Sequence, residues 1–287
     1  MRWIVPSLLI AGMPIALSAA SGDASAENSA AEIASHVAKA ERALPWLWSS
    51  TVEGVADISY TYKEQLSRRI LTRNGKEVPP ARGTSGLGAW RTLQFERVPL
   101  DWGAFLRCLS QDGASPCSKE WNQELERQVS RRDSLTPEMR AKIDATREER
   151  RQRRRDFWDD FPNAFRFEAS GIDQLLFSPL PGYQTEHGAP DGLLKAISGK
   201  LTFDPSTFEI TRLEYDLTRD VEEPFARLAK SAHFEIELMK VEEHYVPRVV
   251  ATHKKAGKSG ETVEETTVFS DYRRFGADSK ILFGDPK

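Results

Sequence analysis

Apolar and polar residues alternate along most of the second half of the chain, and this pattern constrains the fold most. The segments KLTFDPSTFEITRLEYDL, from Lys200, and HFEIELMKVEEHYVPRVVATHKK, from His233, both show it. A period of two is typical of strands with one apolar face. Similar segments, AFRFEAS, DQLLFSPL, AISGKLTF and ETVEETTVFSDYRRF, follow one another with turn signals between them. Short turns favour antiparallel pairing, because parallel strands need long crossovers.

The apolar face switches once within FEITRLEYDL. Phe208 and Ile210 have even numbers, whereas Leu213, Tyr215 and Leu217 have odd numbers. One extra residue in a β-bulge produces such a switch, and bulges bend strands. We therefore predict an α+β fold with a large antiparallel sheet of about ten strands that curls around a helix.

Strands are also predicted in the first hundred residues. The segment ISYTYKEQLSRRI, residues 58–70, alternates in the same way, and RNGK at 73–76 contains the Asn-Gly turn that favours a tight hairpin. The segment AWRTLQFERVPL, from Ala89, places Leu93 and Phe95 on one face. These segments extend the predicted sheet toward the N-terminus.

Three segments have helical spacing. Residues 28–46 carry apolar side chains at helical intervals, and residues 119–129 and 136–158 form a predicted helical insertion at about 119–160. Thr136 is a suitable N-cap and Pro137 suits the first turn. The insertion ends in aromatic side chains that we expect to anchor it to the rest of the fold: Phe157, Trp158 and Phe161.

The stretch REERRQRRR, residues 147–155, contains six Arg and two Glu and cannot lie in a core. A solvated helix with Glu–Arg pairs is the favoured interpretation. The alternative is an anionic-surface site, such as one for lipid headgroups, because arginine binds phosphate well. Its residues would be Arg150, Arg151, Arg153, Arg154 and Arg155.

The N-terminus has the layout of a secretory signal peptide. In MRWIVPSLLIAGMPIALSAASGDASAE, one Arg precedes an apolar run and a stretch of small residues. The run is shorter than the roughly 20 residues of a membrane span. We expect cleavage after Ala26, with Ala20 as the alternative. No Cys follows the run, so residues 27–287 are predicted to form one unlipidated domain in the periplasm or outside the cell, without a transmembrane span.

Cys108 and Cys117 lie in CLSQDGASPC and are the two cysteines of the chain. In an exported protein, an even number of Cys separated by a short polar spacer favours a disulfide that closes a surface loop. A zinc site needs about four ligands, and no nearby His completes one. The spacing also differs from the C-x-x-C of redox enzymes.

No catalytic motif is present. GTSGLG lacks the Lys-Ser/Thr of a phosphate loop, and no Ser lies in a G-x-S-x-G context. The alternation in HFEIE favours a polar strand face over a metal site for His233, Glu235 and Glu237. A net charge of −3 argues against a dedicated nucleic-acid-binding protein. We expect no enzyme activity, no metal and no cofactor.

The order of these segments resembles the periplasmic lipoprotein-localisation family of LolA and LolB. The resemblance covers most of residues 30–275 and rests on ISYTYKEQLSRRILTRNGK, ISGKLTFDPSTFEITRLEYDL, HFEIELMKVEEHYVPRVVATHK and TTVFSDYRRF. It implies an incomplete barrel with a helical lid over a cavity for acyl chains. The chain departs from the family in its larger insertion, and from membrane-anchored LolB in lacking a lipidated Cys.

The predicted function is that of a binding or carrier protein for a lipid, an acyl chain or another apolar ligand. The alternative is a structural or protein-interaction module of the cell envelope, with an envelope protein as partner. The alternation of even- and odd-numbered residues does not decide which face of the sheet points inward. The candidate ligand-binding residues are Tyr60, Tyr62, Leu66, Leu93, Phe95, Phe208, Ile210, Phe234, Ile236 and Leu238.

Overall fold

The computed structural model describes residues 24–44, 60–78, 90–100, 103–114, 135–189, 191–223, 226–228, 230–256 and 261–274. Its helices are α1 (Ala24–Ala43), α3 (Pro137–Ala164) and the short α4 (Asp191–Leu194). The predicted helix at 119–129 and most of the predicted signal peptide lie outside these residues. No helix in this part of the chain is long and apolar enough to cross a membrane.

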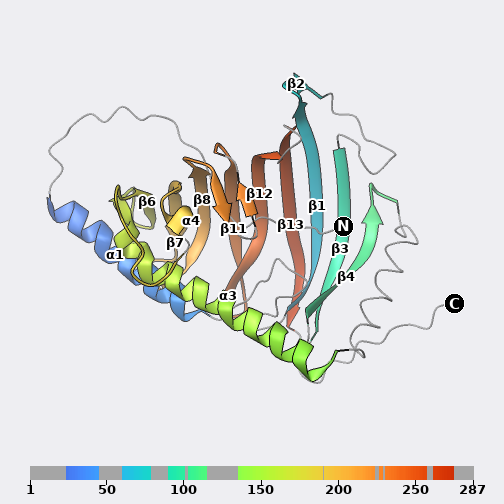
Figure 1. Cartoon of the computed structure of the whole chain (residues 1–287), viewed down its shortest axis with the longest axis horizontal. Helices are drawn as coiled ribbons and strands as arrows, with labels where there is room; N and C mark the ends of the chain where they lie inside the picture. Colours follow the sequence, from blue (N-terminus) through green and yellow to red (C-terminus); the bar gives the residue numbers. More distant parts are fainter. Residues whose placement is uncertain are drawn as a thin grey trace.

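One large antiparallel sheet dominates the described structure (Figure 1). Its strands run in the order β4-β3-β1-β13-β12-β11-β8-β7-β6-β5, and β2 pairs with β1 beside this path. A separate two-stranded sheet contains β9 and β10. The strand bounds are β1 (Tyr60–Arg73), β2 (Lys76–Glu77), β3 (Trp90–Leu100), β4 (Gly103–Gln111), β5 (Phe165–Ala169), β6 (Gln174–Pro179), β7 (Ile197–Phe203), β8 (Ile210–Leu217), β9 (Val221–Glu223), β10 (Ala226–Leu228), β11 (His233–Val241), β12 (His244–Ala256) and β13 (Glu261–Arg274).

The α+β class and the antiparallel pairing are confirmed, but the strongly curved, barrel-like shape is wrong. The sheet is open, with β4 and β5 at its two edges, and it is not strongly curled (Figure 1). The bulge predicted in β8 exists, since Phe203 pairs with Ile210 and Thr202 with Arg212. A further register shift lies in the middle of β11, between Glu237 and Leu238, whereas β12 and β13 pair without interruption. A bulge bends its strand locally, so a few bulges do not by themselves roll up the whole sheet.

The predicted N-terminal helix forms α1, which buries one narrow stripe of small side chains. Ala30, Ala34, Val37 and Ala38 are at most 4% exposed. Their spacing of three to four residues places them on one face of the helix. Because these side chains are small, the helix backbone lies close to whatever it packs against.

Helix α3 confirms the predicted helix from residue 136 and continues to Ala164. The Met139 N–H donates to the Thr136 hydroxyl at 3.3 Å, so Thr136 is the N-cap. In Figure 1 the helix runs along the lower side of the sheet, from the β4 end toward the β6 end. The aromatic anchor is also confirmed, because Phe161 is 2% exposed within a core cluster.

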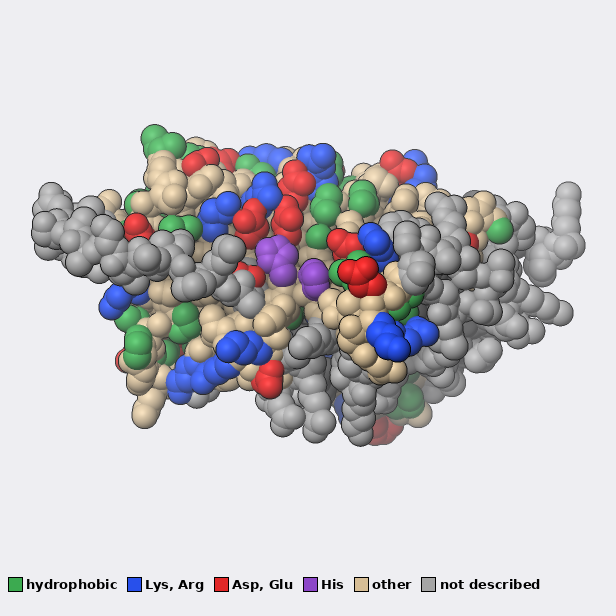
Figure 2. All heavy atoms as spheres, turned by 90° about the horizontal axis from the view of Figure 1, so that it is seen from above, with side chains coloured by type: hydrophobic (Ala, Val, Ile, Leu, Met, Phe, Trp, Pro, Cys, Tyr) green, Lys and Arg blue, Asp and Glu red, His purple; other side chains and the backbone are tan. Residues whose placement is uncertain are grey.

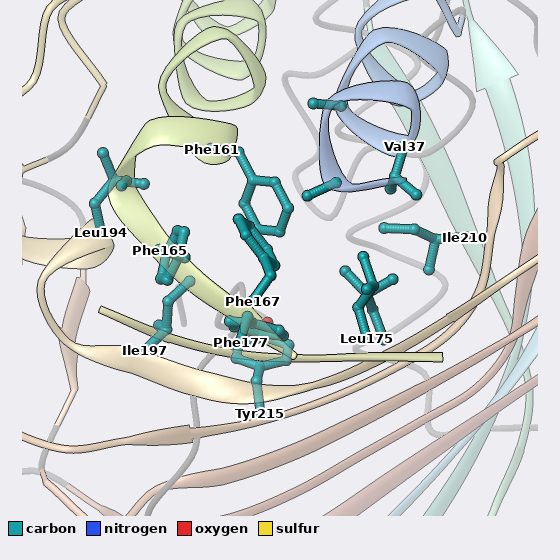
Figure 3. Close-up of a cluster of buried hydrophobic side chains, with 14 of the residues drawn as sticks. Val37, Phe161, Phe165, Phe167, Leu175, Phe177, Leu194, Ile197, Ile210 and Tyr215 are labelled. Atoms are coloured by element: carbon teal, nitrogen blue, oxygen red, sulfur yellow. The ribbon is translucent and has the colours of Figure 1, made fainter. Parts of the chain in front are cut away.

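The main hydrophobic cluster, called here the first core, lies where α1 and the end of α3 meet strands β5 to β8 (Figure 3). The rings of Phe161 and Phe167 are 5.2 Å apart, and those of Phe165 and Phe177 are 5.4 Å apart. Tyr215 stacks on Phe234 at 5.6 Å. A second core, smaller and separate, joins β1, β12 and β13 through Tyr60, Tyr62, Val246, Val250 and Phe269.

Candidate functional site

The ten predicted ligand-binding residues divide among three places in the structure. Five belong to the first core or pack against it: Phe208, Ile210, Phe234, Ile236 and Leu238. Tyr60 and Tyr62 belong to the second core, and Ile236 packs against that core as well. Leu66, Leu93 and Phe95 lie on the neighbouring strands β1 and β3. Their role in ligand binding stays a prediction.

Strand register shows that most of these residues share one face of the main sheet, which we call the inner face. Directly paired residues point to the same side of a sheet. Ile236 pairs with both Leu213 and Val250. Thr267 pairs with both Val250 and Leu66, and Leu66 pairs with Leu93. We name the complete series the apolar row; from β5 to β3 it contains Ala169, Leu175, Leu201, Leu213, Ile236, Val250, Thr267, Leu66 and Leu93.

The described helices cover only part of the apolar row. Both α1 and α3 contact β5, and α1 also contacts α3. Leu175 and Leu201, on β6 and β7, are fully buried beneath this cover. Farther along, Leu213, Ile236 and Leu66 are only half-buried, whereas Val250 and Leu93 of the same row are 6% and 2% exposed. The apolar row is therefore fully buried over β6 and β7 and only partly buried farther along.

Polar contacts hold the end of α1 to α3 and β8. Arg154 donates to the backbone oxygens of Glu41 at 2.5 Å and Leu44 at 3.0 Å. These carbonyls have no partner within the helix at its C-terminus, so the guanidinium caps α1. Arg42 also pairs with Asp159 at 2.5 Å.

The carboxylate of Glu41 links the same three elements. It accepts a hydrogen bond from the Ile210 N–H at 2.9 Å and lies 3.5 Å from the Arg154 guanidinium. Its side chain is 12% exposed. Burial raises the pKa of Glu41 to about 7, although the Ile210 hydrogen bond and Arg154 both lower it. Glu41 is therefore a titratable contact between α1 and the sheet.

A second row on the inner face begins aromatic and becomes polar. Phe167, Phe177, Gly199, Tyr215 and Phe234 follow one another by direct pairing from β5 to β11. The same row continues with Thr252, Glu265 and Arg68 on β12, β13 and β1. Lys254 contacts Glu265, with Nζ 2.6 Å from a carboxylate oxygen. Sequence alternation alone does not reveal this polar cluster, because its members come from three separate strands.

The five arginines of the predicted anionic-surface site lie along α3, and several make contacts within the chain. Arg153 pairs with Glu149 at 2.7 Å, and Arg155 pairs with Glu148 at 2.5 Å. Arg151 lies 3.5 Å from Glu148. Arg154 caps α1 as described, and Arg150 is half-buried. These contacts agree with the favoured interpretation of Glu–Arg pairs, and binding to an anionic surface stays a prediction.

Asp160 organises a loop that the sequence did not single out. Its fully buried carboxylate accepts hydrogen bonds from the Tyr183 hydroxyl at 2.6 Å and from the backbone N–H groups of Glu186 and Ala189 at 2.9 and 3.3 Å. Burial raises the pKa of Asp160, but these hydrogen bonds and one with His187 outweigh it and lower the pKa. Because the partners lie 23 to 29 residues away, no short motif marks this site.

The polar side of β11 has the predicted alternation. His233 is exposed, Phe234 is buried, and Glu235 and Glu237 are half-buried and pair with Arg212 and Arg248. No group of three or more potential metal ligands occurs among the described residues. Figure 2 shows acidic and basic side chains interspersed on the upper side of the molecule, with histidines between them.

Cys108 lies half-buried on the edge strand β4, where it pairs with Phe95 of β3. Cys117 lies outside the described residues, so the Cys108–Cys117 disulfide stays a prediction.

Comparisons with known proteins establish no family for this chain. No protein-family profile matches it, and no curated protein matches it. Among solved structures, it is similar to a LolA superfamily protein from Nitrosomonas europaea, with 8% identity and a TM-score of 0.22, over 86% of this chain and 93% of that chain. The MucA/MucB complex of Pseudomonas aeruginosa is similar with 10% identity and a TM-score of 0.20, over 87% of this chain and 100% of that chain. TM-scores this low carry no conclusion about fold or function.

Proposed function

We propose that the protein is a non-enzymatic carrier for a ligand with an acyl chain or another extended apolar part. We further propose that residues 27–287 act as one domain in the periplasm or outside the cell, after removal of residues 1–26. The observation that carries this proposal is the incomplete helical cover of the apolar row.

The apolar row favours a binding face because a sheet normally buries its apolar face against a second layer. Here Leu213, Ile236 and Leu66 are half-buried where that layer ends. Apolar surface left partly exposed in this way commonly marks a ligand or partner site. An extended hydrocarbon chain lying across β11, β12, β13 and β1 would complete the burial.

The small buried side chains of α1 suit a helix that a ligand can displace. Its buried stripe is mainly Ala, and each buried methyl contributes only about 0.8 kcal/mol, against about 1.5 to 3 kcal/mol for a Leu or Phe side chain. The first core also contains the larger rings of Phe165, Phe167 and Phe177. A ligand chain that replaced α1 would keep those rings covered.

Uptake of a fluorescent fatty acid tests the proposal. The variants Ile236→Gln and Leu66→Gln place an amide in the uncovered part of the row. Each is expected to raise the Kd of the probe by about tenfold, because an unpaired polar group in an apolar contact costs about 1 to 3 kcal/mol. The matched control is Val268→Gln, since Val268 is 41% exposed and pairs with Gln65 on the opposite face.

Two results would count against the carrier function. One is a wild-type protein that takes up no apolar probe, which would favour the alternative of a protein-interaction module of the envelope. The other is an equal loss of probe binding in Val268→Gln, which would show that the inner face is not the site.

A further inference from the structure

The polar end of the second row contains hydrogen-bonding atoms without partners. Thr252 is 5% exposed, and its hydroxyl oxygen has no hydrogen-bond partner. The Nε atom of Arg68 is also buried without one. Most buried polar atoms in proteins do have a partner, and leaving one unpaired costs about 1 to 3 kcal/mol. A ligand that supplied acceptor oxygens would remove this cost.

Arg68 and Thr252 flank the same residue. Each pairs directly with Glu265, from β1 on one side and from β12 on the other. The Arg68 Nε lies 3.4 Å from a Glu265 oxygen, which is an ion pair without the geometry of a hydrogen bond. Strands lie about 4.8 Å apart, so the two backbones are about 10 Å apart, within reach of one head group given the length of arginine.

The charge of this cluster suits an anion. Lys254 and Arg68 are cationic, and Glu265 is the carboxylate between them. The three formal charges therefore leave one net positive charge. The side chains of Lys254 and Glu265 are 15% and 19% exposed, so water screens the charge only in part. The Arg68 side chain is 34% exposed and gives access from solvent.

Apolar side chains continue directly from this cluster. Leu66 is two residues from Arg68 on the same strand and face, and Val250 is two residues from Thr252. Both belong to the apolar row, which leads on to Ile236 and Leu213. A polar site with a net positive charge thus adjoins an apolar track that the described helices leave partly uncovered.

We infer that Thr252, Arg68 and Lys254 form the head-group site for an amphiphile that has an oxyanion head, carboxylate or phosphate, and a single hydrocarbon chain. The chain lies along the apolar row from β1 toward β8, and the head accepts hydrogen bonds from the Thr252 hydroxyl and the Arg68 guanidinium. Lys254 supplies charge beside Glu265. This inference rests on the proposed carrier function and names the ligand class for the same face.

Three ligands of equal chain length distinguish the contribution of the head group to affinity from that of the hydrocarbon chain. Hexadecanoate, hexadecyl phosphate and hexadecanol compete for the fluorescent fatty acid on the purified protein, below their aggregation limits and at low salt. The wild type is expected to bind at least one of the two anions about tenfold more tightly than the alcohol, because charge-assisted hydrogen bonds are the stronger ones. The preferred anion identifies the head as carboxylate or phosphate.

The variant Arg68→Gln is expected to bring the ratio of anion to alcohol affinity near one. Its control is Arg69→Gln, which removes the same charge from the opposite face. There Arg69 pairs with Glu264, and its Nε is also buried without a hydrogen-bond partner. Thr252→Val keeps the shape and removes the unpaired hydroxyl. It should lower the ratio of anion to alcohol affinity several-fold. The unfolding free energy should not fall, because the substitution removes a buried hydroxyl that has no hydrogen-bond partner.

The outcomes distinguish the two proposals. A wild type that binds all three ligands equally would overturn the head-group site and leave the carrier function standing. An equal fall of the affinity ratio in Arg69→Gln and Arg68→Gln would overturn the head-group site in the same way. A wild type that binds none of the three would refute the carrier function itself.

Discussion

Replacing Glu41 by Gln should remove a pH dependence from the stability of the fold. The carboxylate of Glu41 accepts the Ile210 N–H and lies beside Arg154, in the contact between α1, α3 and β8. A Gln side chain can still accept the Ile210 N–H through its carbonyl oxygen. It cannot ionise, so any effect of pH that arises from Glu41 disappears.

The magnitude follows from the raised pKa of Glu41. Burial raises it from 4.5 to about 7, and each pKa unit corresponds to about 1.4 kcal/mol. Between these two values the folded protein keeps a proton that the unfolded chain has released. The folded state therefore loses stability as pH rises from 4.5 to 7, by about 3 kcal/mol, and the loss is complete above pH 7.

Urea unfolding, followed by far-UV circular dichroism between pH 4.5 and 8, measures this effect. The difference in unfolding free energy between Glu41→Gln and wild type should shift in favour of the variant by about 3 kcal/mol over that range. Taking the difference cancels contributions from other titrating groups. Glu32→Gln, an exposed position on α1, is the control and should show no such trend. A constant difference for Glu41→Gln across the range would refute the reasoning.

Three further predictions concern single contacts. Arg154→Gln should lower the unfolding free energy by about 1 to 3 kcal/mol, because it removes the guanidinium that caps α1. Arg153→Gln, which breaks the exposed pair with Glu149, should change the unfolding free energy by about 0.5 kcal/mol or less. Equal effects would contradict the capping role. Thiol labelling of the unfolded protein should detect Cys108 and Cys117 only after reduction, and reduction should cost about 2 kcal/mol, the low end for a short loop; two reactive thiols in the untreated protein would rule out the bond. Gly199→Ala should cost about 3 kcal/mol in urea unfolding, because the new Cβ would collide with the backbone oxygen of Glu214 on β8, and a cost near zero would mean that β7 and β8 separate easily there.

Local sequence signals predicted local structure well. Alternation identified the strands, and the Asn-Gly pair identified the β1–β2 turn, where Asn74 and Gly75 have φ angles of 52° and 74°. Thr136 and Pro137 marked the start of α3. Each of these signals acts within a few residues of chain, so a single sequence contains it.

Contacts between distant segments were not predictable in the same way. The alternation of apolar and polar residues around Phe234 indicated an apolar face. Only the pairing of Phe234 with Tyr215 and Thr252 shows where that face becomes polar. The contact of Glu41 with Ile210 joins residues that are 169 positions apart. The sheet also stays open because closure depends on how all strands coil together, which one bulge in β8 does not determine.

The pairing of β1 with β13 has a consequence for how the protein is made. Thr72 donates its hydroxyl hydrogen to Thr262 across these strands at 2.9 Å, and the two residues are 190 positions apart. In the described sheet, β1 is the link that joins β3 and β4 to everything beyond β13. During synthesis β1 emerges long before β13, so the edge of β1 that pairs with β13 stays unpaired until β13 has been made. Unpaired strand edges promote aggregation. Closing so long a loop is slow, so docking of β1 on β13 is the expected rate-limiting step of folding.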